Sequence, residues 1–159
     1  MEKKDLKPAG VFKYFEEICQ VPRPSKKEEK MIAYLKAFGA KHNLETKVDE
    51  AGNVLIKKPA TPGKENLQTV VLQSHIDMVC EKNNDVQHDF LTDPIETEID
   101  GEWLKAKGTT LGADNGIGVA TELAILADDS IEHGPLECLF TVDEETGLTG
   151  AFALQEEIG

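Results

Sequence analysis

The sequence predicts an α/β fold, in which a layered, mixed and mostly parallel sheet is flanked by helices. Apolar residues recur at helical spacing in several segments, and short apolar, β-branched segments alternate with them. Glycine, proline and polar residues separate the two kinds of segment. A chain of 159 residues, 40% of them hydrophobic, is long and apolar enough to bury the core of one ordinary domain.

Helical periodicity predicts two helices near the start of the chain. The first covers about residues 10–20 and ends before Pro22. Ser25 and Glu28 have the spacing of a capping box, so a second helix is expected to follow them and to end within residues 39–43. Small and apolar residues predict a buried helix over residues 116–127, and a last helix is expected over residues 151–157.

Strands are predicted where apolar segments lie between turn signals. A turn at Ala51–Asn53 joins the first two strands, and the Asp100-Gly101 pair marks a hairpin. Residues 69–72 are apolar and largely β-branched, which is typical of a strand buried on both faces. The predicted strands are 44–49, 53–58, 69–72, 95–100, 103–107 and 136–142.

Composition excludes several classes of partner. Thirty acidic and seventeen basic residues give a formal charge of −13, which disfavours binding to nucleic-acid backbones and to anionic membranes. No apolar run approaches the length of about 20 residues that crosses a bilayer. The three cysteines, without a CxxC spacing, indicate a reduced, cytoplasmic protein. The glycines after Gly112 match no phosphate-binding motif, so no nucleotide cofactor is expected.

Three motifs that carry histidine or acidic residues each lie where a predicted strand ends. Ligands of α/β proteins gather at the carboxyl ends of strands, so we expect the motifs to form one site. One imidazole with several carboxylates is the ligand set of a hydrolytic zinc site or of a dinuclear metal site. The motifs are Ser74–Asp77, Gly112–Gly116 and Asp143–Gly147.

The residues alone leave the role of each acid open. His75 and Asp77 point to the same side of an extended segment, so Asp77 is either a ligand or the group that orients the imidazole. Asp114 is either a bridging ligand or a helix N-cap. Two carboxylates about 4 Å apart repel by about 4 kcal/mol at an effective dielectric constant of about 20, so Glu144 and Glu145 favour a cation nearby unless they lie in an exposed turn.

The three motifs, in this order and spacing, resemble the M20 family of dinuclear zinc peptidases. Three stretches resemble its aminoacyl-histidine dipeptidase branch, also called cytosolic non-specific or Xaa-His dipeptidase. These stretches are Ser74–Asn84, Gly108–Gly118 and Asp143–Gly150.

The resemblance implies roles for five residues. His75 and Glu145 would be metal ligands, and Asp114 would bridge two zinc ions, for which Co²⁺ or Mn²⁺ could substitute. Asp77 would be the catalytic aspartate that holds the imidazole. Glu144 would be the general base that takes a proton from the attacking water.

The resemblance also implies a larger enzyme. Residues 1–159 would be the amino-terminal portion of the catalytic domain, without the lid domain, the remaining acidic ligand and the closing histidine. We therefore expect the 159-residue piece alone to bind zinc weakly and to be inactive.

The intact protein is expected to be a cytoplasmic metallodipeptidase whose partner is a dipeptide substrate, and a homodimer is left open. The alternatives are a tripeptidase, aminoacylase or desuccinylase of the same superfamily, or a non-catalytic binding or assembly module.

Overall fold

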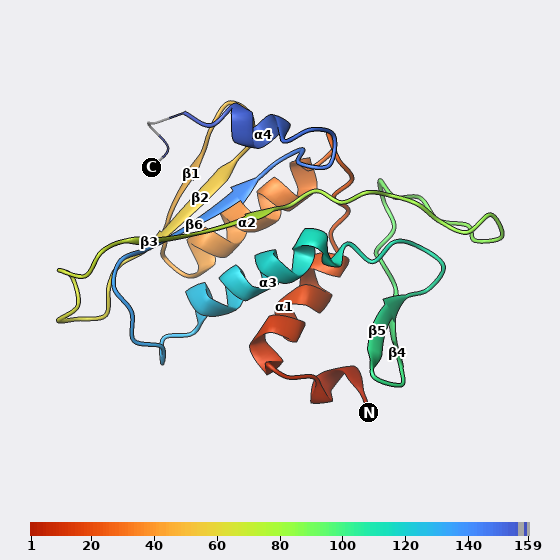
Figure 1. Ribbon diagram of the computed structural model, residues 1–159, viewed down its shortest axis with the longest axis horizontal. Coiled ribbons are helices and arrows are strands. Elements are labelled where there is room, and N and C mark those ends of the chain that lie inside the picture. Colours follow the sequence, from red (N-terminus) through yellow and green to blue (C-terminus); the bar gives the residue numbers. More distant parts are fainter. Residues whose placement is uncertain (156–157, 159) are drawn as a thin grey trace.

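The computed structural model describes residues 1–155 and residue 158. A four-stranded sheet in the order β1-β2-β6-β3 forms its centre, and a separate two-stranded hairpin, β4-β5, lies beside the first helix (Figure 1). In chain order the elements are η1 (Lys3–Asp5), α1 (Ala9–Cys19), α2 (Glu29–Lys41), β1 (Glu45–Val48), β2 (Val54–Lys58), β3 (Val70–His75), β4 (Thr97–Asp100), β5 (Trp103–Ala106), α3 (Ala113–Ala127), β6 (Leu136–Thr141) and α4 (Thr149–Phe152).

The predicted α/β class with a mixed sheet is confirmed, but parallel pairing is less frequent than predicted. β3 and β6 are parallel, whereas β1 pairs antiparallel with β2, and β2 pairs antiparallel with β6. The turn between β1 and β2 is too short for a parallel connection, and the Asp49 carboxylate accepts the amide hydrogens of Gly52 and Asn53 there. α3 lies in the long connection from β3 to β6, which is the arrangement that parallel strands require.

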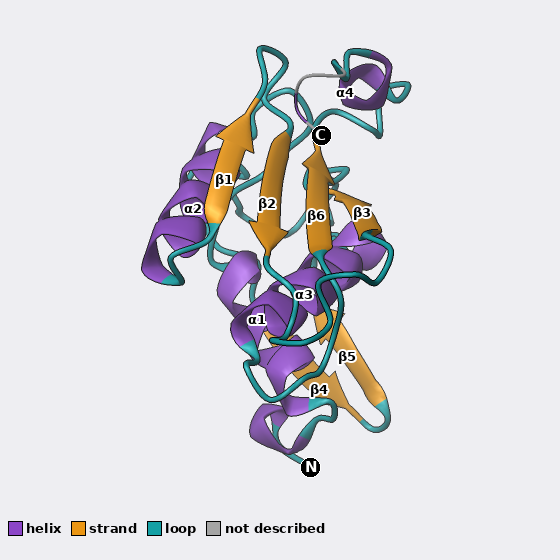
Figure 2. Cartoon of the chain, turned by 90° about the vertical axis from the view of Figure 1, so that its left-hand side faces the viewer, coloured by secondary structure: helices purple, strands orange, loops and turns teal. Residues whose placement is uncertain are grey.

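The core lies between the sheet and the helices α2 and α3, and α1 packs against α3 (Figures 1 and 2). Val54 and Phe140 face each other across β2 and β6, and both are fully buried. Phe15 of α1 and Leu123 of α3 are buried in the same cluster. Burial of each such side chain contributes about 1.5–3 kcal/mol, so this contact of helices and sheet is what places the strand ends.

The expectation that residues 69–72 are buried on both faces is wrong. β3 is an edge strand of the described sheet, and Val70 and Val71 are 50% and 54% exposed. Burial begins only at Ser74 and His75. Apolar, β-branched composition predicted the strand correctly, but it carries no information about how many neighbours a strand has.

The predicted capping box is also wrong. α2 begins at Glu29, and no side chain caps its N-terminus. The hydroxyl of Ser25 instead donates a hydrogen bond of 2.6 Å to Asp77, far along the chain. A strong charged acceptor inside the fold therefore replaces the local acceptor that the motif predicts.

The other helix predictions agree with the structure to within a few residues, except at the end of the chain. α4 ends at Phe152, and the predicted helix over 151–157 extends partly outside the described residues. Within the part of the chain that the structure describes, no helix combines the length and apolarity needed to cross a bilayer.

Candidate metal centre

Three segments meet where β3 and β6 end. The two strands are parallel and in register, with His75 opposite Thr141, so their carboxyl ends lie side by side. His75 is the last residue of β3, and Glu144 and Glu145 follow β6 after a short turn. Asp114 lies at the start of α3, which packs against β3. The sheet thus brings together the predicted residues of all three motifs.

His75 is held between acceptors on both sides of its ring. Its Nδ1 lies 3.0 Å from the main-chain oxygen of Asp77 and 3.3 Å from the Asp77 carboxylate. Its Nε2 lies 2.9 Å from Oδ1 of Asp114 and 3.7 Å from Oε2 of Glu144. The imidazole is therefore fixed in orientation, with Nε2 directed at the acidic side chains.

Asp77 is fully buried and anchors the loop that follows β6. Its carboxylate accepts hydrogen bonds from the Ser25 hydroxyl at 2.6 Å, from the amide of Glu144 at 3.0 Å and from the amide of Glu145 at 3.1 Å. Burial alone would raise the pKa of Asp77, but these donors and His75 outweigh it and hold the pKa well below the ordinary range. Asp77 is therefore an anion that fixes both His75 and the twin glutamates.

The protonation of His75 follows from the same contacts. Burial lowers the pKa of the imidazole, but its hydrogen bonds to Asp77 and Asp114 outweigh burial and raise the pKa to about 9. A cation on this ring is favoured because anionic side chains surround it. The same electrostatic preference extends to any cation near Nε2.

Among the described residues, one group of side chains has ligand atoms close enough together to hold a metal ion. His75, Asp114 and Glu145 each offer one ligand atom, and these atoms all lie within 4.8 Å of one another. Asp77 is not in this set, because its two oxygens face the donors described above.

The position of Asp114 differs from that of an N-cap. Gly112 occupies the N-cap of α3, and no side chain makes a capping hydrogen bond there. Asp114 itself has non-helical backbone angles, and its carboxylate, 85% exposed, reaches His75. The geometry thus favours the interpretation of Asp114 as a ligand over its interpretation as a cap.

The acidic run after β6 is divided by the fold. Asp143 is buried and accepts a hydrogen bond from the Thr146 hydroxyl at 2.5 Å, outside the ligand set. Glu144 and Glu145 remain half-buried and face the site. Burial and then the charge of Glu144 raise the pKa of Glu145, which is the repulsion expected from the sequence. Only two of the three consecutive acidic residues, Glu144 and Glu145, therefore face the site.

Two residues at this site had no functional interpretation from the sequence. Ser25 donates to Asp77, although its spacing to Glu28 indicated a helix cap. Arg23 is buried, and its guanidinium donates to the main-chain oxygens of Ile76 at 3.0 Å and of Gly112 at 2.7 Å. An arginine between two prolines carries no local signal that would predict a buried position.

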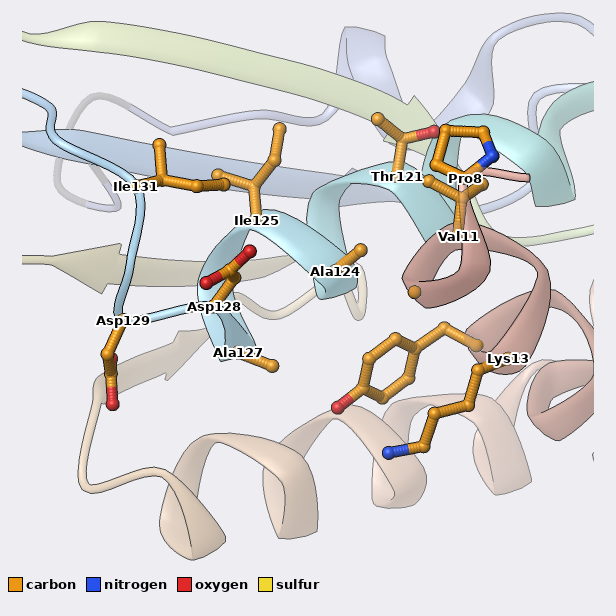
Figure 3. A pocket seen from close by; sticks show the side chains of 12 residues that line it. Pro8, Val11, Lys13, Thr121, Ala124, Ile125, Ala127, Asp128, Asp129 and Ile131 are labelled. Atoms are coloured by element: carbon orange, nitrogen blue, oxygen red, sulfur yellow. The ribbon is translucent and has the colours of Figure 1, made fainter.

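Pockets in the structure lie both at and away from these residues. A pocket of about 290 Å³ adjoins Glu145 and is lined by Ser25 and Met78 among others. A larger one of about 480 Å³ lies between α1 and the carboxyl-terminal half of α3 (Figure 3). Its lining is mainly apolar and has Lys13, Asp128 and Asp129 as charged groups, so we place the chemistry at the strand ends.

Comparison with known proteins gives matches over nearly the whole chain. The chain is 53% identical over 97% of its length to the cytosol non-specific dipeptidase of Escherichia coli strain K12. It matches the structure of aminoacylhistidine dipeptidase from Vibrio alginolyticus over 98% of its length with a TM-score of 0.94 and 55% identity. A tripeptidase from Staphylococcus aureus matches over 94% of the chain with a TM-score of 0.77 and 25% identity.

The chain spans about a third of the length of these relatives: 32% of the two dipeptidases and 40% of the tripeptidase. The family profile described as Peptidase family M20/M25/M40 matches residues 71–158, which include every residue of the ligand set. The fold, the motifs and these matches agree, and the chain belongs to peptidase family M20/M25/M40.

Proposed function

We propose that the complete protein hydrolyses dipeptides, of the Xaa-His type or of broad specificity, at a dinuclear zinc site to which this chain contributes His75, Asp114 and Glu145. The observation that carries the proposal is the convergence of one ligand atom from each of these residues within 4.8 Å. The names of the Escherichia coli and Vibrio alginolyticus relatives support the choice of substrate.

The ligand atoms fit zinc in chemistry and in spacing. Imidazole nitrogen and carboxylate oxygen are both zinc ligands, and two such atoms on a tetrahedral ion lie about 3.3 Å apart. Nε2 of His75 and Oδ1 of Asp114 are 2.9 Å apart, so a small outward movement of Asp114, whose side chain is exposed, admits an ion. Co²⁺ and Mn²⁺ accept the same ligand types and are expected to substitute.

Bound zinc would supply Lewis-acid polarisation of the scissile carbonyl and an acidified water. Asp77 orients the imidazole through Nδ1, so that Nε2 faces the site. Glu144 accepts a proton from the attacking water and delivers it to the leaving amine. Its carboxylate lies 3.7 Å from Nε2 of His75, beside the ligands, and Asp77 holds its main-chain amide.

The relatives' lengths and names also support proposals about the extent and the location of the whole protein. Residues 1–159 are proposed as the amino-terminal portion of a larger catalytic domain, on the basis of the relatives' lengths. The protein is proposed to act in the cytoplasm, and a homodimer is compatible with the account. The isolated 159-residue chain is expected to bind zinc weakly and to be inactive.

Zinc analysis and kinetics of the complete gene product test this function. Glu144→Ala is expected to retain zinc and to lose about 10²- to 10⁴-fold in kcat, because a general base contributes about that factor. Glu137→Ala is the matched control: it removes a carboxylate of β6 that pairs with Lys57 at 3.5 Å, away from the strand ends, and kcat should not change. Hydrolysis that survives removal of all metal would refute the proposal.

A tripeptidase is the second candidate, because the Staphylococcus aureus tripeptidase shares the fold over nearly the whole chain. A panel of dipeptides and tripeptides, assayed with the same zinc-loaded protein, separates the two. The dipeptidase proposal predicts the higher kcat/KM for dipeptides. A higher kcat/KM for tripeptides would favour the second candidate.

A further inference from the structure

We propose that Arg23 is a positioning residue of the metal centre: its buried guanidinium fixes the distance between His75 and Asp114 and thereby sets the affinity for zinc. This inference rests on the proposed metal-dependent function. It concerns a residue that neither carries a ligand atom nor touches substrate.

The position of Arg23 connects the two ligand-bearing segments. Residues 23–25 run beside the continuation of β3, with Pro24 bridged to Met78 and the Met78 amide donating to the Arg23 oxygen at 3.1 Å. From this segment the Arg23 side chain reaches the start of α3. One end of the fork donates to Ile76, next to His75, and the other to Gly112, two residues before Asp114.

The chemistry of arginine suits this task. A guanidinium is planar, and its nitrogens are held at a fixed separation by covalent bonds. Two carbonyl oxygens bound to the two terminal nitrogens are therefore held at a distance that neither segment can change alone. Arg23 is only 2% exposed, and burial lowers its pKa, so the fold retains this cation at the cost of its desolvation.

The glycines of the Gly112–Gly116 motif leave room for the same group. A Cβ atom at Gly112 would lie 2.6 Å from Nη2 of Arg23, and one at Gly116 would also lie 2.6 Å from it. Either side chain would displace the guanidinium. Gly112 also has a φ of +76°, which favours glycine by itself, so the approach of Arg23 is the reason for a glycine at Gly116 in particular.

Lys58 of β2 offers a matched comparison at the opposite end of α3. Its ammonium is also buried and also donates to two main-chain oxygens, those of Ile125 and Asp128. Those oxygens lie at the carboxyl-terminal end of α3, about 14 to 18 Å beyond Gly116 at 1.5 Å per residue. Loss of Lys58 therefore removes the same kind of interaction, together with an ion pair of 3.5 Å to the exposed Asp129, without touching the ligand segments.

The test is the zinc dissociation constant of the complete gene product, measured by chelator competition below the melting temperature of every variant. Arg23→Met and Arg23→Lys are expected to weaken zinc binding by about 10- to 100-fold, the usual effect of losing a group that orients metal ligands. Lys58→Met should change it by less than about threefold. Lysine keeps the positive charge but lacks the two terminal nitrogens of the guanidinium. A wild-type zinc affinity in Arg23→Lys would therefore overturn the inference.

A second pair of variants covers a failure of the Arg23 variants to fold. Gly116→Ala keeps the arginine but places a methyl group against Nη2, and it should weaken zinc binding by about tenfold. Gly10→Ala, whose Cβ would meet Ala124 at an ordinary 3.6 Å, should leave zinc binding unchanged.

If the wild-type protein binds zinc and the Arg23, Gly116 and control variants bind it with the same affinity, the inference about Arg23 is overturned and the proposed function is not. A wild-type protein that binds no zinc overturns the proposed function as well.

Discussion

The contacts of His75 predict that zinc binding depends steeply on pH. The imidazole can bind a metal only after it loses its proton, so protons and zinc compete for the same nitrogen. Asp77 and Asp114 raise the pKa of this group to about 9, against an ordinary value of 6.5. Zinc bound at His75, as proposed, would therefore displace a proton from the imidazole at neutral pH.

The size of the effect follows from the two pKa values. With a pKa of about 9, about 1% of the imidazole is neutral at pH 7, and a rise to pH 8 increases the apparent affinity about tenfold. With an unperturbed pKa of 6.5, the same rise would increase it only about 1.3-fold. The penalty at pH 7 corresponds to about 3 kcal/mol, and the hydrogen bonds to Asp77 and Asp114 are its main cause.

Isothermal titration calorimetry in buffers of different ionisation enthalpy measures both the affinity and the number of protons released. We expect close to one proton per zinc from this group at pH 7. His133→Gln is the control, because that ring bonds to the Gly134 oxygen in a loop before β6, and its loss should leave proton release unchanged. An affinity that is the same at pH 7 and pH 8 would refute the reasoning.

Two further predictions concern buried carboxyl groups. Asp77→Asn replaces an oxygen that accepts hydrogen bonds with an amide that donates them, so it should weaken zinc binding by about 10- to 100-fold in a chelator-competition assay; unchanged binding would contradict the role of Asp77. Glu122 is buried in α3, and burial raises its pKa to about 8. The folded state therefore binds more protons than the unfolded state between about pH 5 and pH 8, and stability falls as pH rises. In urea unfolding, the fall in the free energy of unfolding between pH 5 and pH 8 should be smaller in Glu122→Gln than in the wild type, by up to about 4 kcal/mol. The same pH dependence in the wild type and in Glu122→Gln would contradict this prediction.

The sequence predicted those features that depend on local patterns. Helical periodicity located α1 and α3, and turn residues located the β1–β2 and β4–β5 connections. The site could be predicted because its polar residues directly follow apolar strands, and strand ends converge in this class of fold. His75 and Glu145 lie together for that reason.

Features that depend on partners distant in sequence could not be predicted in this way. The edge position of β3 depends on which strands pair, and no periodicity encodes pairing order. Ser25 has the same local spacing whether it caps a helix or binds Asp77, and the fold selects the charged acceptor. Arg23 is buried because two carbonyl oxygens from distant segments meet around it.

We expect nitrogen and oxygen atoms at the strand ends to hold the metal. The three cysteines offer the rival ligands, but burial raises the pKa of Cys19 and of Cys138 to about 12 and also raises the pKa of Cys80, which disfavours the thiolate form that binds a metal. The zinc-edge X-ray absorption spectrum of the complete gene product tests this directly. We expect nitrogen and oxygen neighbours at about 2.0–2.1 Å, lost in His75→Ala. Sulfur neighbours at about 2.3 Å, or a spectrum unchanged by His75→Ala, would contradict the account.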